Sequence, residues 1–239
     1  MRKQSVPSFR PSLEILSARV VPATISIFDG ALYDEIRIVG TNSADHVVVR
    51  YDGANWVVED KAVGSTCAFP TSSIFLVRFT GGDGDDIFEN YAPIAVVAEG
   101  GNGNDNLTGG PYGDTLYGDY GTDFLNGGDG SDTLEAGLDT DWNWMDGGTG
   151  DDTLYGGNGI DYMHGGDGND LLDGKGGNDD LHGDAGYDVL YGGDGTDYLD
   201  GGVNDGFTDY LSGGAGDDYF RISWDFISDF GFGYDQFYS

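Results

Sequence analysis

Several ingredients that common protein functions require are scarce in this chain. The 239 residues include one cysteine, Cys67, so no disulfide can form within the chain. Ten lysines and arginines stand against 43 aspartates and glutamates, which gives a formal net charge of −33 at pH 7. Such acidity excludes ordinary nucleic-acid binding and disfavours contact with anionic membranes. No hydrophobic run approaches the length of a transmembrane helix.

Familiar catalytic motifs are missing as well. Histidine occurs only at His46, His164 and His182, and neither the zinc-protease pattern His-Glu-x-x-His nor the hydrolase pattern Gly-x-Ser-x-Gly is present. Carboxylate pairs are frequent, but they belong to a repeat that accounts for them without acid–base chemistry. We therefore predict that the chain is not an enzyme. The alternative is an exported hydrolase with its site in the N-terminal β region.

Glycine is the residue in excess, with 44 copies. Residues 100–221 form a tandem array with a nine-residue period and the pattern Gly-Gly-x-Gly-x-Asp-x-apolar-x, which residues 127–135, 165–173 and 192–200 match in full. Thirteen copies fit, and the eighth position is apolar in each. The sixth position is an aspartate in every copy: Asp105, Asp114, Asp123, Asp132, Asp141, Asp152, Asp161, Asp170, Asp179, Asp188, Asp197, Asp209 and Asp218.

Each copy predicts a very short strand and a tight turn. The last three residues alternate in polarity, which suits a strand with one side chain pointing inward. The first six are rich in glycine and suit a turn that needs positive φ values. Such a unit cannot bury a core alone, so the copies must stack, two per turn of 18 residues, between two parallel sheets. The sequence thus predicts an all-β fold, a parallel β-roll (β-helix) solenoid with N- and C-terminal β caps.

Two copies per turn place the sixth-position aspartates on two edges of the coil. One edge would carry every second aspartate from Asp105 to Asp218, and the other those from Asp114 to Asp209. Carboxylates stacked ~4.8 Å apart repel one another unless a cation neutralises them. Carboxylate and glycine carbonyl oxygens suit Ca²⁺, whereas Mg²⁺ tolerates irregular all-protein shells poorly. We therefore predict multiple Ca²⁺ ions as cofactors; an acidic repeat without metal is the alternative.

At these residues the chain resembles the repeats-in-toxin (haemolysin-type) calcium-binding family. The resemblance implies a parallel β-roll with each Ca²⁺ between neighbouring turns. The pattern is broken at Pro111, Tyr112, Ala136, Asp139 and Lys175, and in residues 201–212. The ligands that the resemblance implies are the thirteen aspartates, Asp86 of an earlier copy, and the carbonyl groups of Gly128, Gly130, Gly148, Gly150, Gly157, Gly159, Gly166, Gly168, Gly193 and Gly195.

The charge makes order conditional on the cation. Without Ca²⁺, repulsion should keep the array expanded, and with Ca²⁺ ligand pairing and core stacking arrive together. Many sites of this kind suit millimolar Ca²⁺, so we expect an extracellular or cell-surface location. Two roles stay open: a structural or adhesive surface protein, and a Ca²⁺-triggered secretion and folding module of a type I exported protein.

The array is flanked by three other segments. Residues 1–24 are basic and punctuated by proline, and residues 10–16 with 19–22 resemble a leader of surface proteins from planctomycete bacteria; a disordered tail is the alternative. Residues 25–99 should form a β-rich cap with strands at 25–28, 35–39, 46–51, 55–59, 74–79 and 94–97. A degenerate copy with Asp45 in phase and a full copy at 81–89 suggest a widened start of the same coil. Residues 222–239, after the nonapeptide phase is lost, form an aromatic cap that resembles the closing segment of exported repeat proteins.

One outward face of the roll should be aromatic. The seventh position on one sheet carries Phe124, Trp144, Tyr162, Tyr198 and Tyr219, beside Asn126, Asp146, His164, His182 and Asp200 at the ninth. Such a stripe suits binding of a polysaccharide or a surface protein. Alternatively, the rings only stabilise a flat sheet. The two histidines, one turn apart, are either ordinary surface residues or a transition-metal pair.

Overall fold

The computed structural model describes residues 24–29, 34–70, 74–202, 206–221, 226–227 and 235–238. All regular elements within these ranges are β-strands, and no helix suited to crossing a membrane occurs among them. The predicted leader therefore lies outside the described residues except for Thr24, and most of residues 222–234 lie outside as well.

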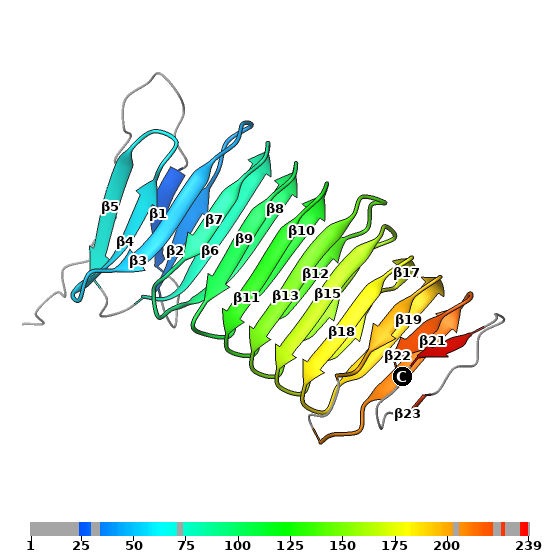
Figure 1. The fold of residues 1–239 in the computed structure, drawn as a ribbon. Helices are drawn as coiled ribbons and strands as arrows, with labels where there is room; N and C mark the ends of the chain where they lie inside the picture. Colours follow the sequence, from blue (N-terminus) through cyan, green and yellow to red (C-terminus); the bar gives the residue numbers. More distant parts are fainter. Residues whose placement is uncertain are drawn as a thin grey trace, which may run out of the picture.

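The strands stack along one axis as the rungs of a coil (Figure 1). They belong to two sheets of 12 strands, between which the chain alternates. The first sheet contains β1 (Thr24–Asp29), β2 (Asp34–Val39), β6 (Ile74–Asp83), β8 (Ala95–Asn102), β10 (Thr115–Tyr120), β12 (Thr133–Gly137), β14 (Thr153–Tyr155), β16 (Leu171–Asp173), β19 (Val189–Gly195), β21 (Tyr210–Ala215) and β23 (Phe226–Ile227), with β17 (Gly176–Gly177) beside β19. The second contains β5 (Ser65–Pro70), β4 (Asn55–Asp60), β3 (His46–Tyr51), β7 (Ile87–Asn90), β9 (Asn106–Gly110), β11 (Phe124–Asp129), β13 (Asn143–Thr149), β15 (Asp161–Asp167), β18 (Asp180–Ala185), β20 (Tyr198–Asp200), β22 (Tyr219–Arg221) and β24 (Gln236–Tyr238).

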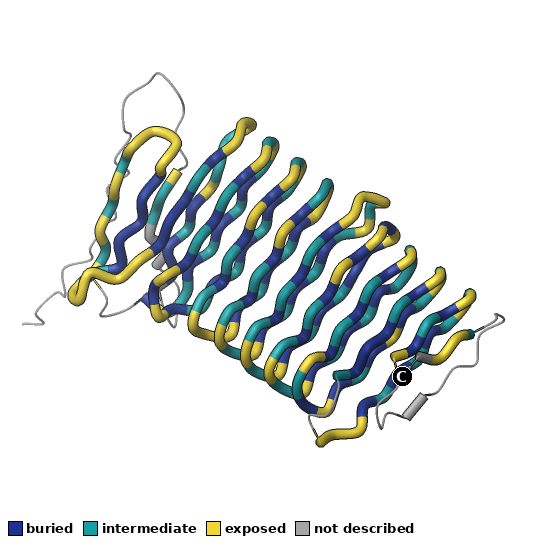
Figure 2. The backbone as a smooth tube through the Cα atoms, viewed as in Figure 1, coloured by how far each residue is buried: buried dark blue, intermediate teal, exposed yellow. Residues whose placement is uncertain are grey.

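The register follows the repeat. Neighbouring strands of the repeat array are parallel, and Leu116 pairs with Leu134 while Leu125 pairs with Met145. These eighth-position side chains are fully buried between the sheets, and they join one continuous core with the apolar residues of the N-terminal strands. Burial alternates along most strands of the repeat array, whereas exposed residues gather at the turns (Figure 2). The predicted parallel β-roll is confirmed.

The N-terminal strands continue the same coil. β2 pairs with β6 and β3 pairs with β7 in parallel, and the six predicted strands in this region are all present. The outer strands β1, β4 and β5 are antiparallel to their neighbours, so the parallel coil ends there. β5 was not predicted, because Ser65–Pro70 carries little β-branched or aromatic character and ends in proline; an edge strand tolerates both.

Strand pairing also continues past Arg221. β23 pairs with β21 and β24 pairs with β22, and the Asp218 N–H donates to Asp235 Oδ1 at 3.2 Å. The rings of Phe220 and Phe237 stack with centroids 5.5 Å apart. Asp235 and Phe237 therefore take the sixth and eighth positions of one more copy, where sequence analysis placed only a cap without the nonapeptide phase.

Close stacking of the turns explains the glycine at the fourth position. Gly150 has φ of 128°, and a Cβ added there would overlap the carbonyl oxygen of Gly130 on the preceding turn. Gly53 also has positive φ, at 97°, but a Cβ added there would meet nothing within 4 Å. A side chain at Gly150 would therefore cause both backbone strain and steric overlap, whereas a side chain at Gly53 would cause backbone strain alone.

We predict that Gly150→Ala lowers the free energy of unfolding of the calcium-loaded protein by about 3 kcal/mol or more, since strain and overlap add. Gly53→Ala, which adds strain alone, should cost about 1 kcal/mol. Denaturant unfolding of both variants in Ca²⁺ measures the difference. Equal losses would mean that the turns stack less closely than the structure indicates.

Candidate metal centre

The sixth-position carboxylates are buried inside the turns of the coil. Each aspartate ends a glycine-rich loop immediately before a strand, and its side chain turns back beneath that loop. None is more than 3% exposed in the set Asp86, Asp105, Asp114, Asp123, Asp132, Asp152, Asp161, Asp170, Asp179, Asp188, Asp197, Asp209 and Asp218. Burying an ionised carboxylate is costly unless it is paired, so these positions need a partner.

One oxygen of each carboxylate links two turns. Asp132 Oδ1 accepts the backbone N–H of Asp114 at 2.6 Å, and Asp152 Oδ1 accepts that of Asp132 at 2.7 Å. The pattern runs along both edges of the coil. The first ladder contains Asp114, Asp132, Asp152, Asp170, Asp188 and Asp209, and the second contains Asp86, Asp105, Asp123, Asn143, Asp161, Asp179, Asp197 and Asp218.

The second oxygen lacks such a hydrogen bond in most of these groups. Within the described residues, Oδ2 is buried and accepts no hydrogen bond in Asp86, Asp105, Asp114, Asp123, Asp132, Asp152, Asp170, Asp179 and Asp197. Each of these oxygens faces the first-position glycine of its own loop. A Cβ on Gly147 would lie 2.5 Å from Asp152 Oδ2 and 2.5 Å from the carbonyl oxygen of Gly165 on the next turn. A carboxylate oxygen and a main-chain oxygen thus face one small space that only glycine leaves open.

Main-chain oxygens line the rest of each turn. Cβ atoms added at the second-position glycines Gly148 and Gly166, or at the fourth-position glycines Gly150 and Gly168, would overlap the equivalent carbonyl oxygen of the preceding turn. Those oxygens include the carbonyl groups of Gly128, Gly130, Gly148 and Gly150. Gly193 and Gly195 face the carbonyl oxygens of Lys175 and Gly177 in the same way. The first-position carbonyl groups are not among the ligands predicted from the sequence, although glycine recurs there in most copies.

Burial shifts the acidity of these groups. Loss of solvation raises the pKa of Asp114 and Asp179 to about 8, opposed by the hydrogen bond from the preceding turn. The same cause raises the pKa of Asp86, Asp123, Asp132 and Asp170 to about 7, and that of Asp105, Asp152 and Asp197 to about 6. The folded turns therefore favour carboxylates that carry a proton or face a cation.

The predicted position of Asp141 in the second ladder is wrong. Asp141 is exposed, and Asn143 is buried in its place, two residues before the core residue Met145. The two extra residues of this copy widen the loop before Asn143 rather than follow the aspartate. Asn143 Oδ1 accepts the N–H of Asp123 at 2.9 Å, and its Nδ2 donates to Asp161 Oδ1 at 3.0 Å.

Asp161, the next carboxylate in that ladder, differs from its neighbours. Its Oδ2 accepts the N–H of Gly157 at 2.6 Å, while Oδ1 accepts the Asn143 amide. Burial still raises its pKa, but these hydrogen bonds oppose the shift. Gly159, also expected to bind metal, lies against the main-chain carbonyl of Asp141. Both carboxylate oxygens of Asp161 therefore accept N–H hydrogen bonds, from Asn143 and Gly157, whereas most other ladder aspartates have an Oδ2 atom without a hydrogen bond.

The donor set fits calcium. Buried Oδ2 atoms without hydrogen bonds and carbonyl oxygens from two successive turns form an all-oxygen environment of the kind that Ca²⁺ prefers. No three His, Cys, Asp or Glu side chains come together around one point in the described part of the chain. Any ion in the ladders would therefore depend on backbone carbonyl groups as much as on carboxylates.

Comparison with known families agrees with this chemistry. The model of the RTX calcium-binding nonapeptide repeat matches residues 99–134, 139–172, 146–181, 173–207 and 205–221. Its matches skip residues 135–138, at the start of the widened loop. No curated protein matches the chain. The chain belongs to the RTX calcium-binding repeat family, and its repeats are calcium-binding repeats.

We predict that the chelated protein gains structure as the pH falls from about 8 to about 5. The folded pKa values of about 6 to 8 exceed the unfolded value of roughly 4. The folded state then binds more protons, so its stability is fully present at low pH and is lost as pH rises through those values. Circular dichroism in chelator measures this. A signal independent of pH would contradict burial of the ladder carboxylates.

We predict that Asn143→Asp destabilises the protein by about 2 kcal/mol at a limiting Ca²⁺ concentration that just folds the wild-type chain, because a donor is lost and two buried carboxylates then face each other. Calcium should restore most of this loss. The control is Asn178→Asp, which adds the same charge at an exposed position and keeps the acceptor for the Thr196 N–H. Thermal unfolding at limiting and at saturating Ca²⁺ compares them; equal effects of the two substitutions would refute the special role of Asn143.

Proposed function

We propose that this chain is an exported structural protein that folds when it meets extracellular Ca²⁺. The observation that carries the proposal is the series of buried Oδ2 atoms without hydrogen bonds along both ladders. Such groups oppose folding at neutral pH when no cation is present, because each ionised carboxylate loses its solvation on burial. Two positive charges per ion would offset that loss and the repulsion between turns.

Calcium would bind between successive turns of the coil. The Oδ2 atom of a ladder aspartate and the first-position carbonyl of the next turn would hold the ion, as Asp152 and Gly165 illustrate. Oδ1 of the same aspartate already accepts an N–H from the preceding turn. One side chain therefore connects the ion to the hydrogen bonds that set the register of the strands, which couples metal binding to folding.

The proposed location follows from the expected affinity. Loop sites built largely from neutral carbonyl groups bind Ca²⁺ weakly, and sites of extracellular modules work at roughly 10⁻⁴–10⁻³ M. Cytosolic Ca²⁺ would leave such a chain expanded, and extracellular Ca²⁺ would fold it. A role as a secretion and folding module of a type I exported protein uses the same property and differs only in what is attached to the roll.

We also propose that the chain has no catalytic activity. In the N-terminal strands, His46 Nε2 lies 3.0 Å from Glu89 Oε2. Glu59 is buried and paired with Arg50 and Lys61, so each of these groups is held by a neighbouring side chain. Hydrolysis of ester, peptide or glycoside substrates that is abolished by His46→Ala would overturn this part of the proposal.

The proposed extracellular location is tested by the range of Ca²⁺ concentration over which the protein folds. We predict that tryptophan fluorescence and resistance to proteolysis change together between about 0.1 and a few millimolar Ca²⁺. Asp170→Asn, which removes one ladder charge, should shift this midpoint upward, whereas Asp151→Asn, at an exposed position on the preceding turn, should shift it far less. A midpoint below micromolar Ca²⁺ would allow folding in the cytosol and would contradict the proposal of folding after export.

A further inference from the structure

The outer face of the second sheet carries a row of rings that crosses several turns. Phe124, Trp144 and Tyr162 occupy the same register on β11, β13 and β15. The ring centroids of Phe124 and Trp144 are 6.1 Å apart. We call the whole row the aromatic ladder; its members are Phe124, Trp142, Trp144, Tyr162, His164, His182 and Tyr198.

Trp142 reaches this face from the widened loop. Its ring meets Phe124 edge-on, with centroids 5.8 Å apart and planes at 82°, and meets Tyr162 at 6.4 Å and 85°. Phe124, Trp142 and Tyr162 remain 43%, 45% and 43% exposed, so their packing against one another leaves much of each ring open to solvent. The two extra residues that displace Asp141 from the second ladder of carboxylates thus also place the indole of Trp142 on the outer face of the sheet.

The histidines continue the row where the aromatic register is broken. Asp180 stands between Tyr162 and Tyr198 in the seventh-position column. The rings of His164 and His182 stack at 4.7 Å with planes 5° apart, His164 lies 6.5 Å from Trp144, and His182 lies 5.8 Å from Tyr198. Neighbouring rings, most of them tilted or edge-on to one another, therefore follow in sequence from Phe124 to Tyr198.

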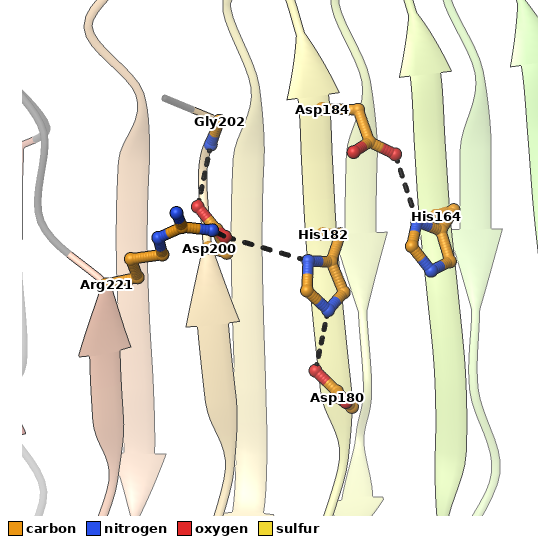
Figure 3. Close-up of polar contacts among 7 residues, drawn as sticks. All are labelled: His164, Asp180, His182, Asp184, Asp200, Gly202 and Arg221. Carbon is orange, nitrogen blue, oxygen red and sulfur yellow. Dashed lines mark hydrogen bonds and ion pairs between the residues drawn. The ribbon is translucent and has the colours of Figure 1, made fainter. Parts of the chain in front are cut away.

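Polar groups fix and flank these rings (Figure 3). His164 Nδ1 lies 3.0 Å from Asp184 Oδ2, and His182 Nε2 lies 2.9 Å from Asp180 Oδ1. Arg221 donates to Asp200 at 2.8 Å. Asp200 is buried, but Asp180 and Asp184 present carboxylate groups beside the rings, a combination that suits a partner with apolar faces and hydroxyl edges.

The negative charge of the protein indicates which class of polymer the aromatic ladder can bind. The carboxylates beside the ladder and the net charge of −33 repel anionic polymers. A cationic polymer would be attracted to the acidic surface as a whole rather than to this row. A row of rings that crosses several parallel strands also suits an extended polymer strand better than a small compact ligand.

We propose that the aromatic ladder binds an extended strand of neutral polysaccharide. The sugar rings stack on Phe124, Trp142 and Tyr162, and the hydroxyl groups donate hydrogen bonds to the flanking carboxylates. The inference rests on the proposed function, because the ladder is assembled only when the roll is folded. It gives the exported module a specific adhesive surface.

The test measures binding of the calcium-loaded protein to cellulose, curdlan and mannan, with alginate and chitosan as anionic and cationic comparisons. Trp142→Ala and Tyr162→Ala should each weaken binding to a neutral polysaccharide by roughly tenfold or more. The control is Tyr191→Ala on the first sheet, a tyrosine of similar exposure at 41%, which should leave binding unchanged. High salt should not abolish the binding, since charge does not drive it.

Circular dichroism of every variant in Ca²⁺ separates loss of the surface from loss of the fold. A folded wild-type protein that binds none of the three neutral polysaccharides would overturn the proposal, and so would binding that Tyr191→Ala weakens as much as Trp142→Ala. Binding confined to chitosan and abolished by salt would overturn it as well. A protein that fails to fold in Ca²⁺ would instead overturn the proposed function.

Discussion

Burial of a carboxylate at each turn is the constraint on which the rest of this structure depends. Oδ1 of the aspartate holds the N–H of the preceding turn and so sets the register of both sheets, as between Asp132 and Asp152. The same burial leaves Oδ2 without a hydrogen bond and raises the pKa of Asp132 to about 7. The glycines follow from this arrangement, since a Cβ on Gly147 would fill the space that the Asp152 oxygen faces. Order in the roll is therefore tied to a proton or a cation.

Much of this could be predicted from the period alone. A strict nine-residue repeat with one apolar position fixes two sheets, a core of residues such as Leu116 and Leu134, and two stacks of aspartates. Asn143 could not be predicted from the motif, because Asp141 also fits the pattern when extra residues are allowed on either side. Only the strand alternation before Met145 decides it. The first-position carbonyl groups were missed because the motif shows which residues recur and not which way their oxygens point.

The widened loop before β13 connects the interior of the roll with its outer face. The insertion puts Asn143 into the second ladder, where its amide replaces a carboxylate and donates to Asp161. It also puts Trp142 between Phe124 and Tyr162 on the surface. The insertion thus removes one buried carboxylate that a cation would have to neutralise between two turns. It also enlarges the aromatic surface on the outer face of the second sheet. This irregular copy therefore differs from the regular copies around it both in its buried ladder residue and in its exposed aromatic residue.

The central claim is that calcium supplies the charge that the buried ladders lack. The most direct measurement is far-UV circular dichroism of the chelated protein at about pH 8, titrated with Ca²⁺ and separately with Mg²⁺, since the ladder carboxylates of the folded state would then be largely ionised. We expect a cooperative gain of β-sheet signal with Ca²⁺ and little change with Mg²⁺. A full β-sheet signal in chelator, or an equal response to both ions, would contradict it.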